Sequence, residues 1–139
     1  MKLEVYIDGG SRGNPGESGI GVYVPGRVRI AEYVGIGTNN LAEYSALLTA
    51  LRFAVFSGCT ELQVFADSEL VVKQIKGEYQ VKNENIRSFY DSAIRWIALI
   101  PRFSISHVRR ENNKEADKLA NLAMIPSARV GFRLLSVPP

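Results

Sequence analysis

The sequence predicts an α/β fold with a mixed five-stranded sheet and helices packed on its faces. Three segments with strand-like alternation come first along the chain, and segments with helical periodicity then alternate with two further strand-like segments. The first three strand segments are joined by short turns and should pair antiparallel, whereas later strands are separated by helices and should run parallel to a neighbour. A chain of 139 residues with 46% apolar and 22% charged residues is typical of one globular domain.

The first three strands are expected in the amino-terminal quarter of the chain. Apolar and polar side chains alternate over residues 2–8 and predict a strand that ends at Asp8. A glycine-rich turn is expected over residues 9–16, because glycine adopts backbone conformations that other residues resist. Residues 20–25 and 28–36 are predicted to form two further strands, joined by a tight proline–glycine turn.

Helices and strands then alternate. Apolar residues at helical spacing predict a helix over residues 41–55, and a fourth strand over residues 62–65 should end at Asp67. A short amphipathic helix over residues 70–75 and a strongly periodic helix over residues 86–100 are expected next.

The last elements are a strand and a helix. Phe103, Ile105 and His107 alternate as a fifth strand. A final helix should begin near Asn112, whose spacing to Glu115 resembles a capping box. Together these elements define one domain over residues 1–125. The tail over residues 126–139 is not placed; its apolar residues would either add an edge strand or cover an apolar patch, and they are Val130, Phe132 and Leu134.

Composition narrows the classes of protein that need to be considered. No apolar run approaches the ~20 residues of a membrane helix, and the amino terminus lacks the layout of a signal peptide. Cys59 is the only cysteine, so we expect no intrachain disulfide and a reducing, cytoplasmic location. The net charge of +3 permits nucleic-acid binding without demonstrating it. We expect a monomer that does not associate with membranes.

Four carboxylates at element boundaries are the candidate catalytic residues. Asp8 and Asp67 end the first and fourth strands, Glu43 is expected in the first turn of the long helix, and Asp117 in the second turn of the last helix. Two unit charges 4 Å apart repel by about 4 kcal/mol at an effective dielectric of 20, so such a cluster needs a cation or a shared proton. Oxygen ligands favour Mg²⁺ or Mn²⁺. Two such ions could activate a water and stabilise the leaving oxygen in phosphodiester hydrolysis.

The alternative is that these four carboxylates are unrelated surface acids. The helix dipole alone would favour Glu43 near a helix start, and Asp67 before Ser68 could be a plain helix cap. The similar context of all four, in this order, favours the catalytic interpretation.

With these residues identified, the chain resembles a type 1 ribonuclease H over residues 2–125. The family pattern consists of short motifs in a fixed order, each of them weak alone. In this sequence the motifs are Asp8-Gly9 with Asn14-Pro15-Gly16, Thr38-Asn39-Asn40 with Glu43, Asp67-Ser68, and Asn113 with Asp117.

The resemblance implies sequence-independent hydrolysis of the RNA strand of an RNA–DNA hybrid, leaving 5′-phosphate and 3′-hydroxyl ends. It implies that Asp8 bridges two Mg²⁺ ions, that Glu43 and Asp67 complete one coordination shell, and that Asp117 completes the other. The substrate-binding residues implied by the resemblance are Asn14 and Asn40 at ribose 2′-hydroxyls, Thr38 and Asn39 at a phosphate of the DNA strand, and Ser68. Helix capping is the alternative explanation for the Thr-Asn-Asn motif, and the family match favours the substrate role.

Two departures from the family pattern matter. Many members carry a basic helix and loop that grip the hybrid, whereas here residues 76–82 lead almost directly into the next helix, so we expect weaker and more salt-sensitive binding. The family also uses a loop histidine that assists product departure. An ungapped alignment would make His107, the only histidine, that loop residue, but its alternation with Phe103 and Ile105 favours a place on the fifth strand. Arg110, seven residues before Asp117, is therefore our candidate for the assisting role.

Other functions remain open from the sequence. A nuclease of the same fold could act on RNA–RNA duplexes, and a non-catalytic nucleic-acid-binding module, such as a detached reverse-transcriptase module, could keep the fold without the chemistry. Retention of all four acids argues against the binding module, which gains nothing from mutually repelling carboxylates. A metabolic phosphatase is a more distant alternative.

Overall fold

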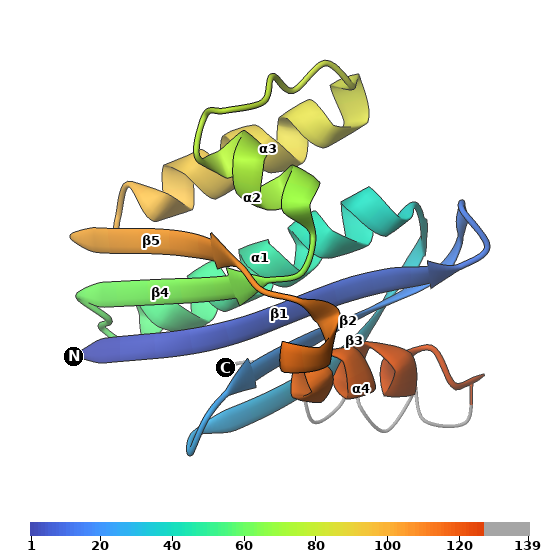
Figure 1. The fold of residues 1–139 in the computed structure, drawn as a ribbon, viewed down its shortest axis with the longest axis horizontal. Coiled ribbons are helices and arrows are strands. Elements are labelled where there is room, and N and C mark those ends of the chain that lie inside the picture. The colour runs from blue at the N-terminus through green and yellow to red at the C-terminus, as the bar shows by residue number, and fades with distance from the viewer. Residues whose placement is uncertain (127–139) are drawn as a thin grey trace.

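The computed structural model describes residues 1–126 and shows a five-stranded mixed sheet with helices on both faces (Figure 1), as predicted. The strand order is β3-β2-β1-β4-β5. The strands are β1 (Lys2–Arg12), β2 (Gly16–Val24), β3 (Val28–Gly37), β4 (Glu61–Ala66) and β5 (Arg102–His107). The helices are α1 (Asn39–Phe56), α2 (Glu69–Ile75), α3 (Glu84–Ile97) and α4 (Lys114–Ala123), and a 3-10 turn, η1 (Arg110–Asn112), precedes α4.

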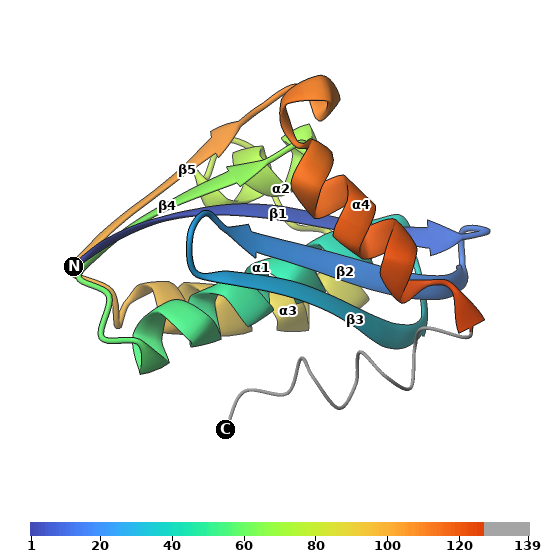
Figure 2. The same ribbon diagram turned by 90° about the horizontal axis from the view of Figure 1, so that it is seen from below.

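The pairing of the strands follows the expected rule. β1 pairs antiparallel with β2, and β2 pairs antiparallel with β3. β1 and β4 pair in parallel, as do β4 and β5. Figure 2 shows α1 and α3 on one side of the sheet and α4 on the other. The main apolar core lies between the sheet and α1, with fully buried side chains such as Ile7, Leu47 and Leu62.

β1 is longer than the sequence indicated. It continues through Arg12, so Asp8 lies within the strand and the expected turn directly after it is wrong. Glycine at position 9 serves close packing instead: a Cβ there would lie 2.4 Å from the carbonyl carbon of Ala42 in α1. The reversal of the chain comes later, at Gly13, whose φ of 86° is left-handed.

Glycines in β2 let α4 approach the other face of the sheet. A Cβ on Gly21 would lie 2.1 Å from the carbonyl oxygen of Ala116, and a Cβ on Gly19 would lie 2.7 Å from that of Ala120. Gly21 is also the partner of Asp8 in the β1–β2 ladder. The two glycines therefore bring the first turns of α4 close to the strand that carries Asp8.

Two helix starts differ from prediction. α1 begins at Asn39 with Thr38 as its N-cap, so Glu43 lies in the second turn and not the first. α4 begins at Lys114, and the predicted capping box from Asn112 is wrong because Asn112 belongs to η1. Asp117 therefore lies in the first turn of α4 rather than the second.

The remaining predictions for β4, α2 and β5 agree with the structure within a residue or two. α3 ends at Ile97, three residues earlier than expected. None of the helices within residues 1–126 has the length and apolar character needed to cross a membrane. The predicted edge strand or apolar cover formed by the tail lies outside the described residues.

Candidate active site

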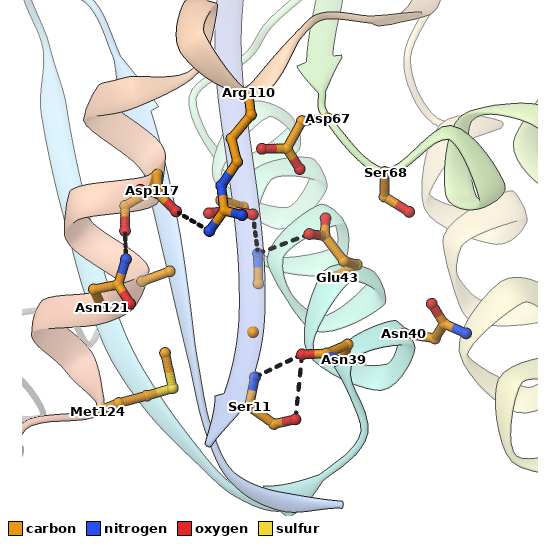
Figure 3. Close-up of a pocket in the computed structure, with 14 residues that line it drawn as sticks. Ser11, Asn39, Asn40, Glu43, Asp67, Ser68, Arg110, Asp117, Asn121 and Met124 are labelled. Carbon is orange, nitrogen blue, oxygen red and sulfur yellow. Dashed lines mark hydrogen bonds and ion pairs between the residues drawn. The ribbon is translucent and has the colours of Figure 1, made fainter. Parts of the chain in front are cut away.

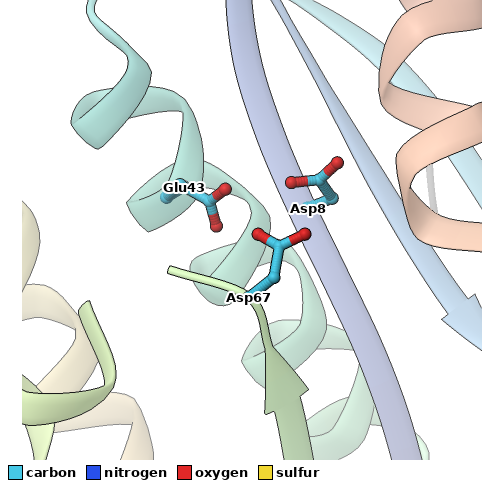
Figure 4. A group of neighbouring side chains, drawn as sticks. All are labelled: Asp8, Glu43 and Asp67. Carbon is cyan, nitrogen blue, oxygen red and sulfur yellow. The ribbon is translucent and has the colours of Figure 1, made fainter. Parts of the chain in front are cut away.

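Three carboxylates from separate elements converge at the centre of the sheet (Figure 4). Asp8 comes from β1, Glu43 from α1, and Asp67 directly follows β4. One carboxylate oxygen from each lies within 4.8 Å of the other two. Asp8 and Glu43 are only 7% and 6% exposed, which is rare for acidic side chains. The structure thus brings together three of the four predicted acids in a group that could hold a metal ion.

The backbone of β1 fixes this arrangement. Parallel pairing of Ile7 with Ala66 places Asp8 beside Asp67, the next residue along β4. The Gly9 amide donates hydrogen bonds to Asp8 Oδ1 at 3.0 Å and to Glu43 Oε1 at 3.2 Å. Because Gly9 has no side chain, α1 packs close enough for this shared donor to reach both carboxylates.

The cluster is electrostatically costly without a cation. The pKa of Asp8 is raised from 3.8 to about 7, chiefly because the carboxyl is buried; the hydrogen bond with Glu43 lowers it, and Asp67 and Asp117 add to the increase. Burial, and then the charge of Asp8, raise the pKa of Glu43 well above its ordinary value. Glu43 Oε2 is buried and has no hydrogen-bond partner among the described residues. An oxygen-rich, acidic site with an unpaired buried oxygen fits a divalent cation such as Mg²⁺ or Mn²⁺.

Asp117 lines the same cavity from α4 but stands outside the group of three. Figure 3 shows it on the opposite side of β1 from Glu43, facing Arg110. The guanidinium Nη2 of Arg110 lies 3.5 Å from Asp117 Oδ1. The cavity has a volume of about 470 Å³.

The positions of Arg110 and His107 differ clearly. Arg110 is exposed in η1 and lines the cavity. His107 ends β5, as the alternation predicted, and pairs with Ala66, whose side chain is buried on the α1 side of the sheet. His107 does not line the cavity. Of the two, Arg110 is the one positioned near Asp117.

Three of the five predicted substrate-binding residues lie next to the carboxylates. Asn39, Asn40 and Ser68 line the same cavity. Thr38 caps α1 through its hydroxyl, which accepts a hydrogen bond from the Leu41 amide at 3.2 Å, so the capping explanation of this residue holds in the structure. Ser68 likewise caps α2.

A second cavity of about 310 Å³ adjoins the first at the amino-terminal end of α1. Asn14 lines it together with Thr38, Asn39 and Asn40, and Asn14 Oδ1 accepts a hydrogen bond from the Asn39 amide at 3.0 Å. The amino-terminal end of α3 closes this cavity with Asn83 and Asn85, which the sequence analysis did not single out.

Asn113 has a role that the sequence analysis missed. Its side chain is 1% exposed and donates hydrogen bonds from Nδ2 to the Ile7 carbonyl at 2.8 Å and to Asp67 Oδ2 at 3.4 Å. Asn113 thus connects β1, Asp67 and the start of α4. Its place in the motif before Asp117 indicated that Asn113 belongs to the site. A local pattern could not predict its hydrogen bond to Ile7, a residue 106 positions away.

Comparisons with known proteins give consistent results. Residues 7–123 match the family described as reverse transcriptase-like. A bifunctional protein of Mycobacterium tuberculosis is 40% identical over 135 residues, which are 93% of this chain and 37% of that protein. Ribonuclease HI of Halobacterium salinarum is 38% identical over 128 residues, 88% of this chain and 64% of the relative. The chain thus spans less than two thirds of the length of both relatives.

A solved structure shows the same fold. LC11-RNase H1 in complex with an RNA/DNA hybrid is 35% identical and superposes with a TM-score of 0.84. The similarity covers 90% of this chain and 98% of that chain.

Proposed function

Since the chain belongs to the type 1 ribonuclease H family, we propose that it is a metal-dependent endonuclease that hydrolyses the RNA strand of RNA–DNA hybrids. The proposed products carry 5′-phosphate and 3′-hydroxyl ends. The observation that carries the proposal is the convergence of Asp8, Glu43 and Asp67 within 4.8 Å in a largely buried site. A protein without a catalytic or metal-binding need would gain nothing from this costly arrangement.

Each acid has a proposed place in metal binding. Asp8, Glu43 and Asp67 would hold one Mg²⁺, and Asp8 and Asp117 would hold a second on the α4 side of β1. When bound, the ions would supply the positive charge that activates the attacking water and stabilises the leaving oxygen. The Gly9 amide and Asn113 keep Asp8, Glu43 and Asp67 in place, so that their orientation precedes substrate binding.

The proposed substrate contacts lie beyond the carboxylates. Asn40 is exposed on the cavity wall and, with Asn14, would meet ribose 2′-hydroxyls, a contact that distinguishes RNA from DNA. Thr38 and Asn39 at the second cavity would hold a phosphate of the DNA strand. Ser68 would contact the cleaved strand at the edge of the first cavity. These contacts are to sugar and phosphate, which accounts for cleavage that does not depend on sequence.

Arg110 is the proposed assisting residue. Its guanidinium is charged at every relevant pH and lies near Asp117 at the mouth of the cavity. In this role it would draw the newly formed phosphate away from the carboxylates and so speed product departure.

The test is cleavage of an end-labelled RNA–DNA hybrid, with RNA–RNA and DNA–DNA duplexes as parallel substrates, in Mg²⁺ and in chelator. We expect cutting of the RNA strand of the hybrid in Mg²⁺ alone, and products that a 5′-phosphate-dependent exonuclease degrades. Preferential cutting of the RNA–RNA duplex would assign the enzyme a different substrate. Hybrid binding without any cutting in Mg²⁺ or Mn²⁺ would favour the non-catalytic binding module.

A further inference from the structure

The cavity extends past the carboxylates. Its α4 wall consists of Asp117, Ala120, Asn121 and Met124, and only Asp117 has a role in the function proposed above. Ser11 and Asn39 lie at the end of the cavity away from Asp67 (Figure 3), and Gly10, the residue before Ser11 on β1, also lines the cavity. Asn121 and Met124 of α4 face them from the other side. Asn121 has no role in the function proposed above, although it is one of the polar side chains at this end.

The position of Asn121 follows from helix geometry. It lies four residues after Asp117, so the two side chains share one face of α4 and are displaced by about 6 Å along the helix axis. Its Nδ2 donates a hydrogen bond to the Asp117 carbonyl at 3.0 Å, which holds the amide along the cavity wall. The residue is exposed to solvent and therefore accessible from the cavity.

The two walls meet β1 at Gly10. A Cβ on Gly10 would lie 3.8 Å from Met124 Cε and 4.0 Å from Asn39 Oδ1, so α4 and α1 approach this position equally. Asn39 Oδ1 accepts hydrogen bonds from the Ser11 amide at 2.9 Å and from its hydroxyl at 3.2 Å, which fixes the α1 wall. A substrate strand that continued past the carboxylates in this direction would lie between α1 and α4.

We propose that Asn121 is a substrate-binding residue that hydrogen-bonds the sugar–phosphate backbone of the cleaved strand next to the scissile phosphate. The inference rests on the proposed function and extends it to the α4 wall. An uncharged amide suits this place, because it offers hydrogen bonds without adding to the negative charge of four carboxylates that already repel a phosphodiester. The displacement from Asp117 is comparable to the spacing of adjacent phosphates along one strand.

The experiment measures hybrid binding separately from cleavage. An Asp8→Asn parent should leave the hybrid uncut, so a fluorescent RNA–DNA hybrid can be titrated in Mg²⁺ and followed by anisotropy. Adding Asn121→Ala should weaken binding about three- to tenfold, as expected for one lost hydrogen bond. Asn121→Asp, which is nearly isosteric, should weaken it more, because it adds a fifth carboxylate one turn from Asp117. The matched control is Asn112→Ala, an exposed asparagine that does not line the cavity.

Folding should not obscure the result. Asn121 is exposed, and alanine has the higher helix propensity, so Asn121→Ala should melt at the same temperature as the parent or above it. In the active enzyme, Asn121→Ala should raise KM while kcat stays within about twofold.

Binding by Asn121→Ala equal to that of the Asn112→Ala control would overturn the inference and leave the proposed function intact. An affinity of Asn121→Asp for the hybrid equal to that of the parent would also overturn the inference. A parent that does not bind the hybrid, together with a wild-type protein that does not cut it, would overturn the proposed function and this inference with it.

Discussion

At the scale of single residues, the unusual feature of this protein is that two nearly buried carboxylates share one backbone donor. Asp8 and Glu43 both accept from the Gly9 amide, and burial raises the pKa of each. Their ionisation therefore opposes folding in the absence of metal. The proposed metal site can therefore be tested through the free energy of unfolding of the metal-free protein, without an assay of activity.

Replacing Asp8 by asparagine should stabilise the metal-free protein, and more so as the pH rises. The pKa of Asp8 is about 7 in the folded protein against 3.8 for the ordinary group, so folding favours its protonated form. The cost of ionising it begins near pH 4, grows up to pH 7, and is complete above pH 7. The free energy of unfolding of Asp8→Asn should therefore exceed that of the wild type by about 1–4 kcal/mol at pH 8, and by much less at pH 4.5.

Urea unfolding in chelator at the two pH values measures this difference. Glu111→Gln is a suitable control, since it changes an exposed acid in η1 that does not line the cavity. A variant at position 8 that loses stability at pH 8 would show that Asp8 is mainly structural.

Arg110 and His107 offer a direct choice for the assisting role. Arg110 lies 3.5 Å from Asp117, whereas His107 ends β5 and does not line the cavity. Arg110→Ala should lower steady-state turnover about tenfold or more while changing hybrid affinity less, and His107→Ala should stay within about twofold of wild type. A larger loss from His107→Ala than from Arg110→Ala in multiple-turnover kinetics would reverse this assignment.

At the scale of elements, the site depends on how closely two helices pack on opposite faces of β1 and β2. α1 approaches at Gly9, and α4 approaches at Gly19 and Gly21. The sequence analysis treated the first glycines as turn residues, because alternation and composition are local signals. The need for glycine at these positions arises from backbone atoms of helices far along the chain, which no local pattern contains.

The difference between local sequence signals and contacts between distant segments also explains which parts of the site were predictable. The four acids could be found because the short motifs that contain them and the spacing of these motifs are visible in the sequence. Asn113 was visible only as part of a motif, since its bonds reach Ile7 and Asp67 across the fold. The start of α4 was misplaced by two residues for a related reason: Asn113 uses its side chain for these long-range bonds and makes no capping bond.

A substitution in β2 tests the role of close packing. A Cβ at Gly21 would lie 2.1 Å from the Ala116 carbonyl oxygen, so Gly21→Ala must displace α4 and should cost about 2–4 kcal/mol of stability. Gly37→Ala is the matched control, because a Cβ there meets only ordinary contacts of 3.7 Å or more. Because α4 carries Asp117, Gly21→Ala should also slow hybrid cleavage at temperatures where the protein stays folded. Equal melting temperatures for the two variants would contradict this view of the β2–α4 contact.

At the scale of the whole molecule, the proposed site couples metal binding to folding. Its three converging ligands come from β1, α1 and the end of β4, so the site exists only when these elements are assembled. A cation that binds the folded state alone stabilises it by mass action. For a dissociation constant near 1 mM, 10 mM Mg²⁺ would add roughly 1.4 kcal/mol.

We therefore expect Mg²⁺ to raise the melting temperature by several degrees. The increase should be smaller in Asp67→Asn, which keeps the shape of the side chain but removes one ligand charge. Sodium chloride at equal ionic strength controls for general screening. An equal shift in the wild type, in Asp67→Asn and in the sodium chloride control would mean that the three carboxylates do not bind the ion.

The most direct test of the central claim compares the wild type with Asp8→Asn on one labelled RNA–DNA hybrid in Mg²⁺, with cleavage, hybrid affinity and melting temperature measured on the same preparations. The account predicts that cleavage of the RNA strand is lost by at least about a thousandfold, that hybrid affinity changes little, and that the melting temperature is equal or higher. Cleavage that survives in Asp8→Asn at a similar rate would contradict the claim that these carboxylates form the catalytic centre.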